Sequence, residues 1–172
     1  MSNEHKQEAQ DIINCKIITV SDSRTIDTDY SGQLMKEMLL KYDHNVTAYE
    51  LVSDEKAEII QAFHSGCNDH KVDVILLNGG TGLAKRDVTI ESIQPLLDKE
   101  MIGFGEIFRI ISYLEDIGSA AILSRAIAGV SSNTAIFCTP GSIGAVKLAM
   151  EKLILPELRH VVREIRKDLY TF

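Results

Sequence analysis

The most informative stretch of this chain is Val72-Asp73-Val74-Ile75-Leu76-Leu77-Asn78-Gly79-Gly80-Thr81-Gly82. The residues up to Leu77 are almost all apolar, which is typical of a central strand covered on both faces. Three glycines within four positions follow, and glycine lets the backbone adopt the positive φ angles of a tight turn. A central strand that ends in such a turn indicates an open α/β sheet with a ligand site beyond the carboxyl ends of its strands.

Strand-like and helix-like segments alternate on both sides of this stretch. The patterns predict further strands over Cys15–Val20, Val46–Val52, Ala126–Val130 and Thr134–Cys138. They predict helices over Gly32–Tyr42, from Ser53 as N-cap to about Gly66, from near Val88, over Phe104–Glu115, from Ile143, and a last one that Pro156 starts or kinks. This alternation predicts a three-layer α/β/α sandwich with a mostly parallel central sheet. We expect a flexible tail over residues 1–13 and a single domain over residues 14–172.

Composition limits the function classes that need consideration. The chain has 172 residues, 45% of them hydrophobic, which suits one globular domain that needs no disulfide or metal to fold. Its 25 acidic and 18 basic side chains leave a formal charge of −7, which argues against a general nucleic-acid binder. A small anionic ligand stays compatible with this charge, since a local group of cations or backbone N–H groups can outweigh it.

We expect no segment of the chain to lie in a membrane or to direct secretion. The longest run without a charged residue, Ala126–Val146, contains several polar residues and a proline, and fits two strands better than a spanning helix. Met1–Asp11 is polar without an apolar core, unlike a secretory signal. Three widely spaced cysteines, Cys15, Cys67 and Cys138, are expected to be unpaired in a reducing compartment. The cytoplasm is the expected location.

The glycine turn Asn78–Gly82 is the strongest candidate site. Its N–H groups could form a concave anion-binding loop before a helix, or the glycines could simply make a tight turn. A P-loop does not fit, because Ala84 stands where the second glycine is required. A dinucleotide fingerprint does not fit either, because Lys85 stands where it requires glycine. Two ordinary turns, Ser21–Arg24 and Thr139–Ser142, also follow predicted strands and offer hydroxyls and N–H groups.

Charged residues near the glycine turn suggest metal-assisted chemistry on phosphates. Lys85 and Arg86 could offset phosphate charge, and the carboxylate of Asp87 could hold Mg²⁺. The alternative is that Asp87 only caps the helix that begins at Val88. Asp54 follows another predicted strand, at the same edge of the sheet, so it could act as a second carboxylate beside Asp87.

Taken together, these segments resemble the MoaB/MogA family of molybdenum-cofactor biosynthesis proteins. The resemblance runs from about Ile17 to Pro156, and its order and spacing are specific although no single motif is. The similar segments are Val20–Arg24, Leu51–Glu55, Gly79–Gly82, Arg86–Thr89, Gly103–Arg109, Ser124–Val130 and Pro140–Ser142. The segments that begin at Gly103 and Ser124 are closer to MoaB than to MogA.

The resemblance implies a homo-oligomer, trimeric or hexameric, that binds molybdopterin, a pterin dithiolene with a terminal phosphate. In active members that phosphate attacks the α-phosphate of ATP, giving adenylyl-molybdopterin and pyrophosphate. By this similarity Asp54 and Asp87 match the two functional aspartates and would position Mg²⁺ and the nucleotide, while Gly79–Gly82 would cradle the phosphates. The candidates for the pterin side are Ser21, Asp22, Ser112, Pro140, Gly141 and Ser142.

Other positions bear on whether the activity is retained. Arg109 and Arg125 could offset ligand charge or act as structural ion-pair partners. Asn78 stands where relatives often have Thr, a small polar exchange that should leave the loop intact. Some MoaB-type members do not catalyse adenylylation and have lost parts of the segment that matches Arg86–Thr89. This chain keeps that segment and Asp54, which favours activity.

The leading hypothesis is therefore a molybdopterin adenylyltransferase that uses Mg²⁺ and ATP. An alternative is a non-catalytic protein of the same fold that holds molybdopterin or another enzyme of cofactor biosynthesis. A third is an unrelated α/β nucleotide binder, which fold-level similarity alone would support weakly.

Overall fold

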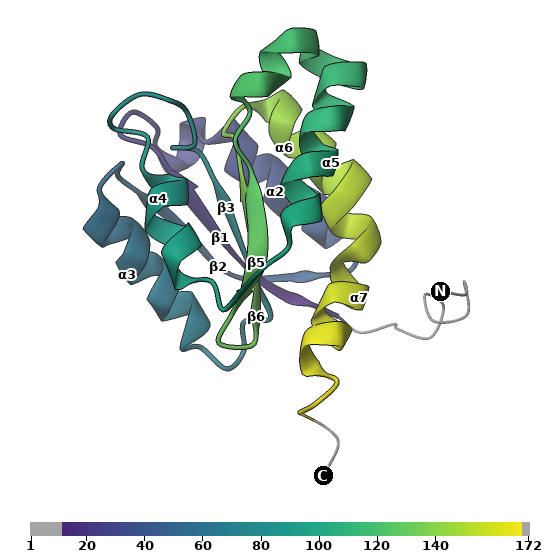
Figure 1. Ribbon diagram of the computed structural model, residues 1–172. Helices are drawn as coiled ribbons and strands as arrows, with labels where there is room; N and C mark the ends of the chain where they lie inside the picture. Colours follow the sequence, from purple (N-terminus) through teal and green to yellow (C-terminus); the bar gives the residue numbers. More distant parts are fainter. Residues whose placement is uncertain (1–11, 170–172) are drawn as a thin grey trace.

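The computed structural model describes residues 12–169, so most of the expected N-terminal tail lies outside the described residues. A six-stranded sheet with the order β2-β1-β3-β6-β5-β4 forms its centre (Figure 1). The strands are β1 (Asn14–Val20), β2 (Asn45–Val52), β3 (Val74–Asn78), β4 (Lys99–Glu100), β5 (Ile127–Ser131) and β6 (Thr134–Thr139). The first three and β6 run parallel, whereas β5 is antiparallel to β6 and β4 is antiparallel to β5.

Helices cover both faces of this sheet (Figure 1). One face carries α2 (Tyr30–Lys41), α5 (Ile102–Ser112), α6 (Ile143–Ala149) and α7 (Leu155–Arg166), and the other carries α3 (Lys56–Cys67) and α4 (Thr89–Ile93). Successive residues of a strand point to opposite faces, so Leu76 belongs to the first hydrophobic core and its neighbour Leu77 to the second. The predicted three-layer α/β/α sandwich is confirmed.

Short helical segments join these elements. They are η1 (Ile26–Thr28), η2 (Gln94–Leu96), η3 (Tyr113–Ile117), η4 (Gly118–Leu123) and η5 (Met150–Ile154). The helix predicted over Phe104–Glu115 therefore changes its winding at Tyr113, where α5 passes into the wider π-helical η3. The turn between β5 and β6 has positive φ at Ser132 (49°) and Asn133 (62°), which suits a tight hairpin.

Two predicted caps are wrong. Ser53 does not cap α3, because its backbone N–H donates to the Glu58 carboxylate (3.1 Å) and the helix begins only at Lys56. Asp87 does not cap α4, because its Oδ2 accepts a hydrogen bond from the backbone N–H of Ala84 (3.1 Å) and the N-cap position is Val88. The Asp87 carboxylate therefore stays with the loop that precedes the helix.

The apolar segments of the chain form the strands of the sheet and the two hydrophobic cores that pack against it. Cys15 and Cys138 are buried and all three cysteines are unpaired, as expected. In the described range 12–169, no helix is both long and apolar enough to cross a membrane.

Candidate functional site

A cavity of about 510 Å³ opens at the carboxyl ends of β1, β2, β3 and β6. The four strands run in the same direction, so the loops that follow them meet at one edge of the sheet. The segment η3–η4 forms a further wall. The lining residues are Val20–Arg24, Asp54, Gly79–Gly82, Arg86, Asp87, Ile117, Ala120, Leu123, Ser124, Pro140 and Gly141.

Most of the residues proposed from the sequence meet in this cavity. Asp54, Asp87 and the whole glycine turn line it, together with Ser21, Asp22, Pro140 and Gly141. Two proposed residues lie outside the lining. Ser112 is buried in α5, where its hydroxyl donates to the Phe108 carbonyl (2.7 Å). Ser142 caps α6, its Oγ accepting the backbone N–H of Ala145 (3.2 Å).

Carboxylates gather beside the glycine turn. Asp22 and Asp54 exchange two hydrogen bonds, each backbone N–H donating to the other side chain at 3.2 and 2.8 Å. A Cβ added to Gly80 would lie 3.0 Å from Asp54 Oδ1, and one added to Gly82 would lie 2.6 Å from Asp87 Oδ2. Both aspartates therefore flank the same turn, as the sequence predicted.

The electrostatics of this edge favour a cation. Partial burial raises the pKa of Asp54 above its ordinary value, and the negative charges of Asp22 and Asp87 raise it further. Within residues 12–169, no group of three or more His, Cys, Asp or Glu side chains is placed so that it could hold a metal ion by itself. Mg²⁺, however, commonly takes one or two carboxylates and completes its shell with water and substrate phosphates, and this donor set fits that pattern.

The glycine turn can hold an anion. Gly79 and Gly80 have φ values of 92° and 62°, a left-handed geometry that other residues rarely adopt. A side chain at Gly79 would place its Cβ 2.3 Å from the Val20 carbonyl oxygen, so only glycine fits there. Within residues 12–169, the backbone N–H groups of Gly80, Thr81 and Gly82 donate no hydrogen bond to the protein. Such unpaired N–H groups beside one cavity form an anion-binding nest.

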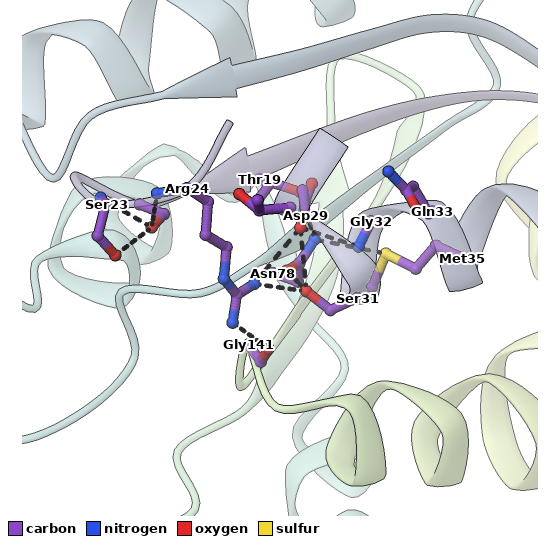
Figure 2. A network of polar contacts seen from close by, with 12 residues as sticks. Thr19, Ser23, Arg24, Asp29, Ser31, Gly32, Gln33, Met35, Asn78 and Gly141 are labelled. Carbon is purple, nitrogen blue, oxygen red and sulfur yellow. Dashed lines mark hydrogen bonds and ion pairs between the residues drawn. The ribbon is translucent and has the colours of Figure 1, made fainter. Parts of the chain in front are cut away.

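A polar network around Arg24 lies beside the cavity, where the loops that follow β1 and β6 meet (Figure 2). The Arg24 guanidinium donates to the Gly141 carbonyl (2.9 Å) and to the Ser31 hydroxyl (2.6 Å), and it faces the carboxylate of Asp29 (3.4 Å). Ser31 in turn donates to the side chain of Asn78 at the end of β3 (2.9 Å). Arg24 thus links the loops that follow β1 and β6 to the strand that precedes the glycine turn.

Sequence reasoning missed part of this site. Arg24 lies in a turn that the sequence singled out, but nothing local indicates that it reaches Gly141, which is 117 positions away. Ile117, Ala120 and Leu123 are small or apolar residues without a motif, and only the path of η3–η4 brings them to the cavity. Arg125 does not line the cavity and pairs with Glu91, which fits the ion-pair alternative.

Comparison with known proteins gives a consistent set of matches. Residues 16–160 match the family model described as a probable molybdopterin binding domain. Molybdenum cofactor biosynthesis protein B of Bacillus subtilis (strain 168) is 65% identical over 165 residues, which cover 96% of this chain and 97% of the relative. The protein of the same name from Staphylococcus aureus (strain COL) is 50% identical over 157 residues, covering 90% and 93% of the two chains.

Solved structures show the same relationship. A crystal structure of molybdenum cofactor biosynthesis protein B superposes with a TM-score of 0.91 at 57% identity, covering 93% of this chain and 99% of the other. The tungsten cofactor synthesizing protein MoaB from Pyrococcus furiosus gives a TM-score of 0.82 at 38% identity, with 92% and 99% covered. On these matches and on the shared fold, the chain belongs to the MoaB family of molybdenum cofactor biosynthesis proteins, whose domain is a probable molybdopterin-binding domain.

Proposed function

We propose that this protein is a Mg²⁺-dependent molybdopterin adenylyltransferase. The observation that carries the proposal is the meeting of Asp54 and Asp87 on either side of a glycine turn whose N–H groups are unpaired within residues 12–169. Carboxylates that can hold Mg²⁺ beside a phosphate cradle are the recurring parts of phosphoryl-transfer sites.

In the proposed reaction, an oxygen of the molybdopterin phosphate attacks the α-phosphorus of ATP. A new phosphorus–oxygen bond forms, the bond from the α-phosphorus to the oxygen bridging to the β-phosphate breaks, and pyrophosphate leaves. Asp54 and Asp87 would hold Mg²⁺, which supplies positive charge to the phosphate oxygens when bound. The N–H groups of Gly80–Gly82 would bind the phosphates, and the exposed guanidinium of Arg86 would offset charge that develops on them.

The pterin would occupy the part of the cavity lined by the loops that follow β1 and β6. Ser21 and Asp22 follow β1, and Pro140 and Gly141 follow β6, so these residues lie on both sides of the glycine turn. Polar hydroxyl, carboxylate and backbone groups suit the hydrogen-bonding edge of a pterin ring. The positions of Ser112 and Ser142 outside the lining leave these four as the proposed pterin contacts.

Substitution of the two aspartates tests the proposal. Asp87→Asn and Asp54→Asn should each lower turnover about 10²–10³-fold, because each removes a charge that positions the metal and phosphates. The assay follows pyrophosphate and adenylylated pterin after incubation with molybdopterin, ATP and Mg²⁺. Asp27→Asn is the matched control, an exposed carboxylate in η1 outside the cavity lining, and should turn over like the parent.

The outcomes separate an enzyme from a scaffold. If both aspartate variants turn over like the parent, the assignment of these residues is wrong. If the parent binds molybdopterin but calorimetry detects no Mg-ATP binding and no pyrophosphate forms, the protein is a non-catalytic binding protein of the same fold.

We also propose that the chain works as a homo-oligomer. Ile107, Ile110, Leu114 and Ile117 recur at spacings of three and four residues along α5 and η3 and are 44–70% exposed. An apolar stripe of this kind is costly in water and marks a contact surface. A trimer or hexamer built through this stripe would shield it.

A further inference from the structure

Four successive carbonyl groups of the glycine turn accept hydrogen bonds from Thr89 and Arg125. The Thr89 hydroxyl donates to the Gly79 carbonyl (2.8 Å), and the Thr89 backbone N–H donates to the Gly80 carbonyl (3.0 Å). Arg125 continues the series, its Nε donating to the Thr81 carbonyl (2.9 Å) and its Nη2 to the Gly82 carbonyl (2.7 Å). Two residues that lie 36 positions apart along the sequence thus hold the carbonyls of one loop.

The direction of these carbonyls sets the direction of the N–H groups. In a planar trans peptide the C=O and the N–H of the next residue point in opposite directions, and no peptide bond in the described chain is cis. Holding the carbonyls of Gly79, Gly80 and Thr81 therefore turns the N–H groups of the residues that follow each of them to the other side. These are the N–H groups that have no partner within residues 12–169.

All three nitrogen atoms of the Arg125 guanidinium contact other groups of the protein. Its Nη1 forms a short ion pair with Glu91 of α4, and its Nη2 also contacts the second carboxylate oxygen (3.3 Å). Nε and Nη2 are bonded to the loop carbonyls, and Arg125 is absent from the cavity lining. A guanidinium presents its donors in one rigid plane, so it can hold two carbonyls at a fixed geometry, which a lysine ammonium cannot.

We propose that Arg125 is a positioning residue that orients the glycine loop for anion binding by holding the Thr81 and Gly82 carbonyls, without itself touching the ligand. The fixed carbonyls keep their partial negative charge away from the phosphates and leave the opposite N–H groups for them. The inference rests on the proposed function, since it concerns the phosphate cradle of that same site. Under this proposal, Arg125 acts through the geometry of its hydrogen bonds and not through its positive charge alone.

Mg-ATP titration of four variants tests this role. Arg125→Lys and Arg125→Gln should weaken Mg-ATP binding by similar factors, about fivefold to tenfold, because both lose the two-carbonyl geometry. The salt dependence of the affinity should stay that of the parent, since no charge is lost from the ligand contact. Arg86→Lys and Arg86→Gln are the comparison pair, because Arg86 lines the cavity and is exposed. Arg86→Lys should keep most of the parent's affinity for Mg-ATP. Arg86→Gln should lose most of that affinity, and its Mg-ATP binding should depend less on the salt concentration.

Other results would overturn the assignment. If Arg125→Lys binds like the parent while Arg125→Gln binds weakly with reduced salt dependence, Arg125 acts through its charge. If the melting temperature falls while the affinity of the folded variants is unchanged, Arg125 only stabilises the fold.

Thr89→Val removes the hydroxyl that holds the Gly79 carbonyl, and it provides the same test should the Arg125 variants not fold. It should also weaken binding at unchanged salt dependence, and parent-like binding would contradict the role of the held carbonyls.

Failure of the proposed function would look different. A parent that binds Mg-ATP but forms no adenylylated pterin refutes the reaction and leaves the role of Arg125 to be decided by the four variants. A parent that binds neither Mg-ATP nor molybdopterin refutes both, because the loop would then hold no phosphate.

Discussion

His44 lies just after α2 and is buried, with 2% of its surface exposed. Its Nδ1 accepts the backbone N–H of Ile13 (3.3 Å), and Nε2 has no partner within residues 12–169. Burial, together with the positive charge of Arg159, lowers the pKa of His44 from 6.5 to about 4, while the negative charge of Asp43 acts in the opposite direction. The folded protein therefore resists protonation that the unfolded chain accepts.

This difference predicts a loss of stability in acid. Between pH 6.5 and about 4 the unfolded chain binds a proton at His44 that the folded chain does not, so the free energy of unfolding falls as the pH falls through this window. From pH 7 to 4.5 the contribution is about 2–3 kcal/mol. Urea unfolding at both pH values should show that His44→Gln loses less stability than the parent by this amount. A pH dependence of stability in His44→Gln that is as steep as that of the parent would contradict the prediction.

The residue scale also shows what a single sequence can predict about a site. Asp54 and Asp87 were assigned correctly to one edge because each follows a predicted parallel strand, and such strand ends share an edge. Ser112 was a candidate from family resemblance, yet its hydroxyl satisfies the Phe108 carbonyl within its own helix. A helical serine gives no local signal that distinguishes these two uses.

At the scale of elements, the start of α2 is tied to the cavity by its cap. Asp29 is fully buried and accepts a hydrogen bond from the Gly32 N–H (3.1 Å), and its Oδ1 lies 3.2 Å from the Ser31 hydroxyl that also contacts Asn78. Its second oxygen accepts a short hydrogen bond from the Tyr49 hydroxyl of β2. Burial alone would raise the pKa of Asp29, but hydrogen bonds from neighbouring hydroxyls and the Gly32 N–H keep it below the ordinary value. The carboxylate thus stays charged beside Arg24 (Figure 2).

Two caps of different burial should differ in energy. Asp29→Ala should cost about 2–3 kcal/mol in free energy of unfolding, because it leaves the half-buried Tyr49 hydroxyl without this acceptor and the Arg24 guanidinium with only its Gly141 and Ser31 contacts. Ser142→Ala removes the exposed cap of α6 and should cost about 1 kcal/mol, since water can replace the lost bond. Denaturant unfolding of both variants measures the difference. Equal costs would mean that the network around Asp29 adds nothing to an ordinary cap.

Considering the whole molecule, the exposed apolar stripe of α5 and η3 reaches the ligand cavity. Ile117 belongs both to this stripe and to the cavity lining. Assembly through the stripe would therefore cover the outer side of one cavity wall. This places the proposed oligomer contact next to the proposed active site, with Ile117 in both.

A charge placed in this stripe should break the assembly. Ile110→Asp should lower the mass measured by light scattering from a multiple of 19.1 kDa toward that of one chain, because an unpaired carboxylate is costly in an apolar interface. Leu40→Asp, at a similarly exposed apolar position on α2, is the control and should keep the parent mass. A parent that is already monomeric, or an Ile110→Asp variant of unchanged mass, would contradict the proposed contact.

The alternation of strands and helices, the glycine turn after β3 and the two aspartates at strand ends were all readable from the sequence. They depend on periodicity and spacing over a few residues, and on the rule that parallel strands end at one edge. The winding change at Tyr113 and the wall made by η3–η4 had no such local signal. The contact from Arg125 to the Thr81 carbonyl joins residues 44 positions apart. Only the tertiary structure could decide it, because an arginine's partners depend on which backbone groups the fold brings within reach of its guanidinium.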